Sequence, residues 1–212
     1  MPHRGPGPHP DPPPDLATRA LPLKEIAGPL FRIHSARKAP LYFGATGDNR
    51  FDDPRSAFGV LYADLSPACA FIETFGEPFN ISFITQSELD AHKISRVVLS
   101  SHLLFVNLTG SHLNPLGADS RLFAGDHRIA QRWSRAFYEH PDQPCGLLYL
   151  ARHDPSQQAV ALFDRAKPSL STASRTTHPF GSDSVCSGAT LGSPQNRTLL
   201  TMLLRKYKRT LL

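Results

Sequence analysis

Cysteine is scarce in this chain, and long apolar runs are missing from it. The three cysteines, Cys69, Cys145 and Cys186, are odd in number and widely spaced. This pattern favours neither a disulfide framework nor a metal knuckle, and it fits a reducing compartment. No apolar run approaches the roughly 20 residues of a membrane span, and the polar, proline-rich N-terminus has no apolar segment typical of a signal peptide. These absences predict a cytoplasmic protein with no membrane partner.

Several common functional motifs are also missing. The sequence contains no phosphate-binding loop of the P-loop type, no GxGxxG, no HExxH and no GxSxG. Its ten histidines form no close pair with another histidine, a cysteine or a carboxylate at a metal-ligand spacing. No groove-reading motif and no strand of interleaved basic and aromatic residues is present. We therefore expect no metal site and no direct binding of nucleic acid.

The length of the chain predicts one domain, and its composition predicts a disordered N-terminal tail. Domains usually contain about 100–200 residues, and this chain has 212. Residues 1–20 are dense in proline, a composition that buries too little apolar surface to order itself. We expect the domain to span 21–212, with a long surface loop at 166–192, where serine, threonine and glycine dominate. The net charge of +5 favours anionic ligands without choosing among them.

Strand and helix patterns alternate irregularly along the domain. Short apolar runs predict strands at 30–34, 59–65, one or two within 96–108, and a pair near 145–151 and 157–164. Capping residues and apolar spacing predict helices at 66–76, 126–141 and 193–208. Because strands and helices do not alternate regularly, we expect an α+β fold with a mixed or antiparallel sheet and a few helices.

Glu73 is the first candidate site residue. It lies in the segment SPACAFIETFG, in which Ser66 is a predicted N-cap, and Cys69 and Ala70 precede it by one helical turn. The carboxylate therefore lies on a small, apolar helix face and should be at least partly buried. A buried carboxylate either pairs with a cation or has a displaced pKa. Periodicity alone leaves a functional carboxylate and a structural Glu–Arg pair about equally favoured.

Two arginines are candidates for anion binding. Arg32 lies inside a predicted strand, and its guanidinium could bind a diphosphate through paired hydrogen bonds or be satisfied by Glu73 or an aspartate. Arg50 stands beside Phe51 in a glycine-rich loop, which places a second cation next to an aromatic ring. Neither arginine identifies a ligand by itself.

The order of several motifs resembles the RES-domain family. LFRIH is followed by RFDDP, GVLYAD, AFIETFG, CGLLYLARHD and AVALFD. The resemblance runs from about Leu21 to the C-terminal NRTLLTMLLRKYK and omits the proline-rich leader and the loop after Ala166. Single motifs are unspecific, whereas their order and spacing together are fairly specific.

The resemblance implies an ADP-ribosyltransferase-like fold and a toxin of a bacterial toxin–antitoxin pair. By motif, it implies catalytic roles for Arg32, Tyr62 and Glu73, and we expect Arg32, Arg50, Phe51 and Ala151 to contact the substrate. The family's serine should fall at Ala151, where this chain has no hydroxyl. In such a site Glu73 would stabilise the oxocarbenium-like ribose, the arginines would hold the diphosphate, and Tyr62 would orient the nicotinamide.

The family resemblance leaves two classes of function open. In the leading one, the chain cleaves the nicotinamide–ribose bond of NAD and depletes it, with water, phosphate or a protein side chain as acceptor. NAD is then a substrate, no other cofactor is expected, and a cognate antitoxin protein would cover the active site. Degradation to a small product ranks ahead of protein ADP-ribosylation. In the other class, Ala151 marks a degenerate, non-catalytic RES domain that serves as an antitoxin-binding partner.

Overall fold

The computed structural model describes residues 7, 9–77, 82–173 and 185–212. In the described part, the α-helices are α1 Pro67–Phe75, α2 Gln86–Asp90, α3 Leu113–Leu116, α4 Arg121–Ala124, α5 His127–Tyr138 and α6 Arg197–Lys206. The strands there are β1 Leu23–Ile26, β2 Leu30–Ser35, β3 Val60–Asp64, β4 Phe83–Ile84, β5 His92–Leu99, β6 Leu103–Asn107, β7 Gly146–Leu150, β8 Gln158–Phe163, β9 Leu170–Thr172 and β10 Thr210–Leu211.

One curled sheet carries the fold. Eight strands follow the order β1-β6-β7-β8-β3-β2-β5-β9, and β4 pairs with β10 separately. Neighbours in the large sheet are antiparallel apart from the parallel pair of β6 and β7. The α+β class with a mixed, mostly antiparallel sheet is therefore confirmed.

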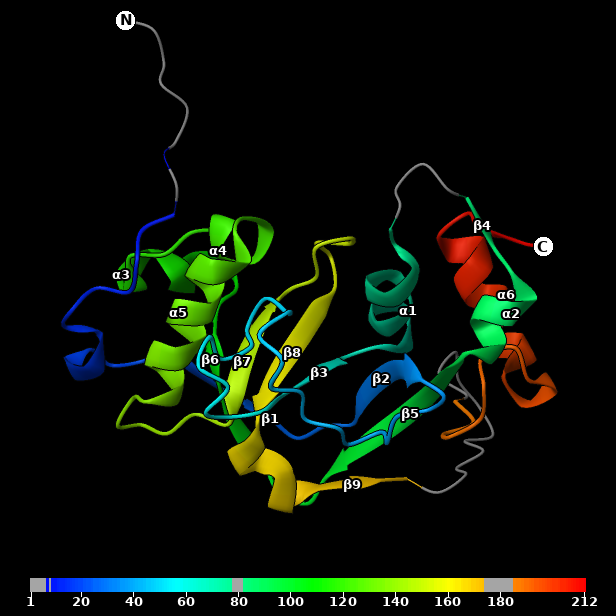
Figure 1. Cartoon of the computed structure of the whole chain (residues 1–212), viewed down its shortest axis with the longest axis horizontal. Coiled ribbons are helices and arrows are strands. Elements are labelled where there is room, and N and C mark those ends of the chain that lie inside the picture. Colours follow the sequence, from blue (N-terminus) through cyan, green and yellow to red (C-terminus); the bar gives the residue numbers. More distant parts are fainter. Residues whose placement is uncertain (1–6, 8, 78–81, 174–184) are drawn as a thin grey trace, which may run out of the picture.

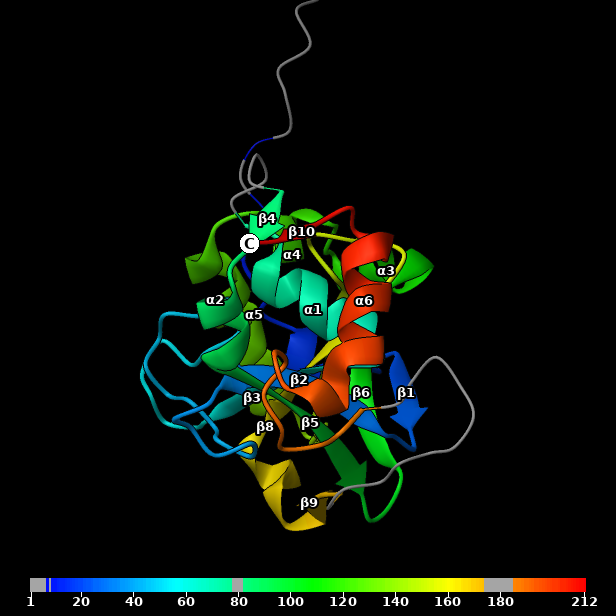
Figure 2. The same cartoon turned by 90° about the vertical axis from the view of Figure 1, so that its right-hand side faces the viewer.

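Two groups of helices lie at opposite ends of this sheet (Figure 1). The group of α3, α4 and α5 packs a core that includes the fully buried Trp133 and Phe137. The group of α1, α2 and α6 packs a second core that includes Phe71, Leu89 and Leu203. From the side, α6 stands in front of α1, with β4 and β10 above them (Figure 2). The middle of the sheet is left between the two groups.

Local capping explains where the two longer helices of the site begin. The Ser66 hydroxyl accepts a hydrogen bond from the Cys69 N–H, and Pro67 occupies the first turn of α1. The Asp126 carboxylate accepts from the Arg128 N–H at the start of α5. The C-terminal helix differs from expectation. Its first turn at 194–196 is a 3₁₀ turn, and α6 begins only after Asn196, whose amide bonds to Cys186 and Thr190 instead of capping.

The N-terminal segment differs from the expected disordered leader. Residues 1–6 and 8 lie outside the described residues, but Leu16 is 3% exposed and belongs to the core that contains α5. The indole N–H of Trp133 donates to the Pro10 carbonyl (2.9 Å), and Nε2 of His140 lies 3.2 Å from the Leu16 carbonyl oxygen. In the described part of this segment, the buried Leu16 side chain attaches it to the domain, a contact that composition averaged over 20 residues does not reveal.

We expect Leu16→Ala to lower the free energy of unfolding by about 2 kcal/mol, because it removes a buried side chain from the core. The matched control is Leu23→Ala, since Leu23 is 36% exposed and should cost well under half as much. Urea unfolding of both variants measures the difference. Equal effects would contradict the attachment of this segment.

The described flanks of the predicted surface loop at 166–192 also differ from expectation. Residues 174–184 lie outside the described residues. Before them, β9 pairs with β5, and after them the Gly188 and Leu191 N–H groups donate to the Ile94 and His92 carbonyls of β5. Leu191 is fully buried. The described residues on both sides of the gap therefore bond to β5, and they do not form an exposed loop throughout.

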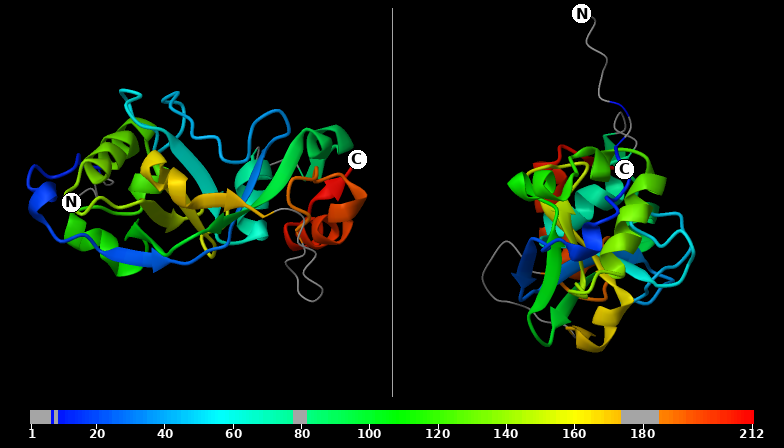
Figure 3. Two further views of the ribbon diagram at one scale, coloured as in Figure 1. Left: turned by 90° about the horizontal axis from the view of Figure 1, so that it is seen from below. Right: turned by 90° about the vertical axis from the view of Figure 1, so that its left-hand side faces the viewer.

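The segment 36–59 positions part of the site without helix or strand. It runs along one side of the sheet as irregular loops (Figure 3). Gln131 of α5 donates to the Gly47 and Asn49 carbonyls (2.7 and 3.0 Å), and the Asp52 carboxylate accepts from the Asn49 N–H (3.1 Å). These bonds fix the loop against α5. No helix in the described part is long and apolar enough to cross a membrane.

Candidate functional site

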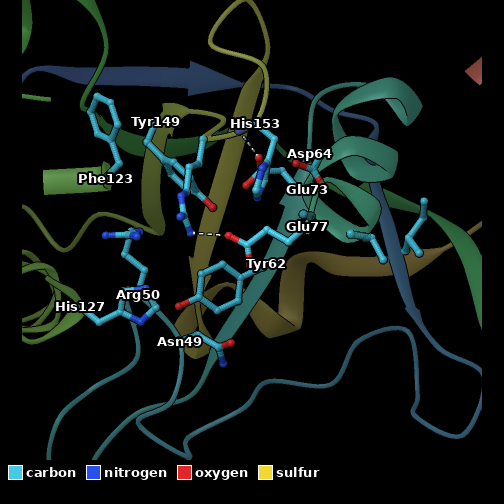
Figure 4. Close-up of a pocket in the computed structure, with 14 residues that line it drawn as sticks. Asn49, Arg50, Tyr62, Asp64, Glu73, Glu77, Phe123, His127, Tyr149 and His153 are labelled. Carbon is cyan, nitrogen blue, oxygen red and sulfur yellow. Dashed lines mark hydrogen bonds and ion pairs between the residues drawn. The ribbon is translucent and has the colours of Figure 1, made fainter. Parts of the chain in front are cut away.

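A cavity of about 420 Å³ lies between the two helix groups. Its walls come from α1, from the ends of β3 and β7, from the loop around Asn49, and from α4 and α5 (Figure 4). The charged side chains that line it are Arg50, Asp64, Glu73, Glu77 and Arg152, and the aromatic ones are Tyr62, Phe123 and Tyr149. Both charge signs and several rings therefore meet in one space of the size that usually holds a small ligand.

Glu73 lines this cavity from the second turn of α1. Cys69 and Ala70, one turn earlier, are 0% and 1% exposed, and Glu73 itself is half-buried. Its Oε1 accepts a hydrogen bond from the His153 N–H (3.0 Å). Across the described ranges no arginine lies within ion-pair distance of this carboxylate. Of the two alternatives left by the sequence, the structural Glu–Arg pair is therefore not formed there.

Tyr62 joins the cavity to the loop that carries Arg50. Its hydroxyl accepts from the Phe51 N–H (2.8 Å) and donates to Oδ1 of Asp52 (3.0 Å). Burial first, and then the Asp52 charge, raise the pKa of Tyr62 well above its usual value. The hydroxyl therefore stays protonated and hydrogen-bonded to the loop. The aromatic ring is the part of Tyr62 that faces the cavity.

Arg50 places a cation on the opposite wall. Its Nη1 donates to the Gly125 carbonyl (2.8 Å), which fixes the guanidinium at the start of the α5 region. Burial lowers the pKa of Arg50, and the positive charge of Arg152 lowers it further. Arg152 pairs with Glu77 (3.0 Å), whereas the Arg50 guanidinium donates to a neutral carbonyl. A partly buried cation of this kind favours an anionic ligand.

Arg32 lies behind Tyr62 and lines a neighbouring cavity of about 280 Å³. The two cavities share Ile33, Asn49 and Tyr62. Nη1 of Arg32 donates to the Tyr62 carbonyl (2.9 Å), while Nε is buried without a hydrogen-bond partner among the described residues. Burial lowers the pKa of Arg32, and the Asp64 charge opposes this shift. Arg32 therefore supports the β3 backbone directly below the site.

Phe51 and Ala151 do not line the cavity with their side chains. Phe51 is fully buried and packs edge-on against Tyr149, with ring centroids 4.9 Å apart. Only its backbone N–H serves the site, through Tyr62. Ala151 is 1% exposed, and its N–H donates to the Gln157 carbonyl (3.1 Å). The chain buries both side chains away from the lining of this cavity, and their contact with a substrate stays a prediction.

Asp64 and Tyr149 are site residues that the sequence motifs did not single out. Asp64 is the last residue of β3, 8% exposed, and it lines the cavity beside Tyr62. Burial raises the pKa of Asp64 to about 7, with the nearby Glu73 charge adding to the rise. The strand alternation in GVLYAD is a sufficient signal, since residues two apart on a strand share a face. Tyr149 of β7 is 8% exposed and lines the same cavity.

A metal centre finds no support within the described ranges. They contain no group of three or more His, Cys, Asp or Glu side chains arranged to hold a metal ion.

Comparison with known proteins identifies the family of the chain. The RES domain family model matches residues 29–182, which is most of the chain, and the chain belongs to this family. The family resemblance stated from the sequence is thereby confirmed, and the match includes Arg32, Tyr62, Glu73 and Ala151.

Two particular proteins are similar to parts of the chain. "Probable toxin y4kH" of Sinorhizobium fredii (strain NBRC 101917 / NGR234) is 39% identical over 51 residues, which are 24% of this chain and 39% of that relative. The chain thus matches well under half the length of this curated relative. The M. tuberculosis MbcT–MbcA toxin–antitoxin complex matches with a TM-score of 0.58 and 16% identity, over 71% of this chain and 84% of that one. At this identity the second likeness shows the fold.

Proposed function

We propose that this chain is a toxin that breaks the nicotinamide–ribose bond of NAD and thereby depletes NAD in the cell. Membership in the RES domain family supports this, as do the words "toxin" and "toxin–antitoxin complex" in the names of the two similar proteins. The single observation that carries the proposal is the composition of the cavity. Glu73 faces it from one helix group and Arg50 from the opposite wall, with the Tyr62 ring between them.

The charges of this cavity suit the parts of NAD. Cleavage at the nicotinamide ribose develops positive charge on the sugar, and a fixed carboxylate such as Glu73 stabilises that charge. Arg50 and Arg152 would attract the diphosphate, whose anionic oxygens accept paired guanidinium hydrogen bonds. The Tyr62 and Tyr149 rings offer faces to the cationic nicotinamide ring. Arg32 would hold the backbone of β3 in place and add positive potential beneath the substrate.

The hydrogen bond from His153 gives Glu73 a defined orientation. A backbone N–H fixes Oε1 and leaves Oε2 for a ribose hydroxyl or for the developing charge at the anomeric carbon. Such a preorganised carboxylate loses little reorganisation energy during the reaction. Transfer of ADP-ribose to a protein side chain is the alternative outcome of the same bond cleavage, and analysis of the products separates the two.

The partner we propose is a cognate antitoxin protein that covers this cavity. A protein of this kind would place a polar or acidic group against Arg50, whose guanidinium is bonded to the neutral Gly125 carbonyl (2.8 Å). Expression of the chain in a bacterial host with intracellular NAD followed over time tests the function. Falling NAD with soluble protein present is the expected result, whereas constant NAD under the same conditions contradicts it.

Ala151→Ser tests whether the missing family hydroxyl weakens the enzyme. Because Ala151 is buried and away from the cavity lining, we expect NAD turnover within about threefold of the wild type. Adding a buried hydroxyl should lower the free energy of unfolding by about 1–3 kcal/mol if it finds no partner. The control is Ala27→Ser at an exposed position, and kinetic assays with urea unfolding provide both readouts. A large gain in turnover would mean that the natural chain is a weakened enzyme.

A further inference from the structure

Asp64 lines the cavity together with the carboxylates of Glu73 and Glu77, and it has no role in the proposed bond cleavage. It ends β3 and is 8% exposed, and it lines the same cavity as Glu73 (Figure 4). No lysine, arginine or histidine within the described ranges lies within ion-pair distance of it. A buried carboxylate that lines a cavity without a paired cation is costly to the fold, and such costs concentrate at functional sites.

The groups that face Asp64 come from three elements packed against it. Arg32 of β2 contributes a positive charge, Glu73 of α1 a negative one, and Tyr149 of β7 a buried phenol. The Cys69 thiol of α1 donates a hydrogen bond to the Asp64 carboxylate. Burial raises the pKa of Cys69, so the thiol stays protonated and serves as a donor. With a pKa of about 7, Asp64 changes charge near neutral pH.

Whether the reaction requires a base depends on the molecule that accepts the ADP-ribose. The bond between the nicotinamide nitrogen and C1′ of the ribose breaks, and its electron pair leaves with nicotinamide, which needs no proton. When water attacks C1′, the new C–O bond leaves an excess proton on the oxygen, and a base must take it. A phosphate dianion needs no base, and its negative charge would be repelled by the carboxylates that line the cavity.

We propose that Asp64 is the general base that takes the proton from an attacking water, so that the chain hydrolyses NAD to nicotinamide and ADP-ribose. This inference rests on the proposed function and names the acceptor that it left open. The proton moves from water to the Asp64 carboxylate and then to solvent through the open cavity. Glu73 stabilises the sugar while Asp64 serves the nucleophile, so the two carboxylates have separate tasks.

The test compares the wild type with Asp64→Asn, an isosteric change, and with the exposed control Asp142→Asn. NAD is supplied in ¹⁸O-labelled water with millimolar phosphate, and the products are identified by mass. We expect the wild type to form ADP-ribose that carries ¹⁸O, with hydrolysis falling on the acid side of pH 7. Asp64→Asn should lose about 10²–10⁴-fold of this activity, keep its circular-dichroism spectrum, and lose the acid limb of the pH profile.

Azide distinguishes a base from a merely structural aspartate. Azide attacks C1′ without a proton to remove, so it should restore NAD consumption in Asp64→Asn and give ADP-ribosyl azide. A phosphorylated sugar as the main wild-type product overturns the inference. So does hydrolysis by Asp64→Asn with an unchanged pH profile, or a failure of azide to restore consumption. If the wild type leaves NAD intact, the proposed function fails and the role of Asp64 fails with it.

Discussion

Replacing Glu73 with glutamine is expected to lower kcat for NAD cleavage by at least about 10²-fold, a loss typical of removing one preorganised electrostatic group. Glutamine has nearly the same shape, and its Oε1 can still accept the His153 N–H that fixes the native side chain at 3.0 Å. The variant should therefore fold normally and bind NAD with a similar KM, since the negative charge matters mainly where positive charge develops.

The control for this change is Glu25→Gln, which removes one carboxylate from the exposed edge strand β1. Its kcat should equal that of the wild type within error. Steady-state assays of nicotinamide release, together with circular dichroism, measure both variants. If Glu73→Gln retained most of the wild-type kcat, Glu73 would have no part in the chemistry. Loss of the folded spectrum would instead favour a structural role for this residue.

Replacing Asp64 with asparagine is expected to stabilise the protein at pH 8 by up to about 4 kcal/mol. The pKa of Asp64 rises from 3.8 to about 7 on folding, and each pKa unit corresponds to about 1.4 kcal/mol. Between these pH values the folded state holds a proton that the unfolded state has lost. The free energy of unfolding contributed by Asp64 therefore falls as pH rises from about 4 to about 7.

Urea unfolding of the wild type and Asp64→Asn at pH 5 and pH 8 measures this dependence. The two proteins should be closer in stability at pH 5, and the variant should be the more stable one at pH 8. Asp142→Asn, on the exposed surface, should follow the wild type at both. Equal pH slopes for all three proteins would mean that the carboxylate of Asp64 is not strained by burial. A gain in stability with a loss of activity is the usual cost of a functional charge in a core.

The regular elements of this fold follow from local signals in the sequence. Ser66, Pro67 and Gly76 mark the limits of α1 to within one residue, and Asp126 caps α5 as expected. These predictions succeed because capping and apolar spacing depend on neighbours only a few residues away. The same local signals place Glu73 on a partly buried helix face, where the structure also has it.

The features that the sequence did not predict depend on contacts between distant segments. Phe51 looks like a loop residue by its neighbours, yet Tyr149 of β7 packs on its ring, about a hundred positions away in the chain. Leu16 stands among prolines and is buried only because α5 provides a core for it. Arg32 reaches the Tyr62 carbonyl rather than an anion because β3 lies next to β2. Local patterns contain no information on such pairings.

Asp64 differs from these residues, because a local signal does indicate its place. It follows Tyr62 by two residues on the same strand, so the two side chains share a face. The family resemblance points to Tyr62 and carries no information on the other residues of that face. Strand alternation in GVLYAD, applied together with the resemblance, is sufficient to place both side chains in one cavity.

The most direct test of NAD cleavage by this chain is the release of nicotinamide from NAD by the purified wild-type protein. The protein is incubated with NAD, and nicotinamide and the remaining NAD are quantified by chromatography over time, with heat-denatured protein as the blank. Nicotinamide is expected to appear in equal molar amount to the NAD consumed. Folded protein that leaves NAD intact over hours would contradict the proposed activity.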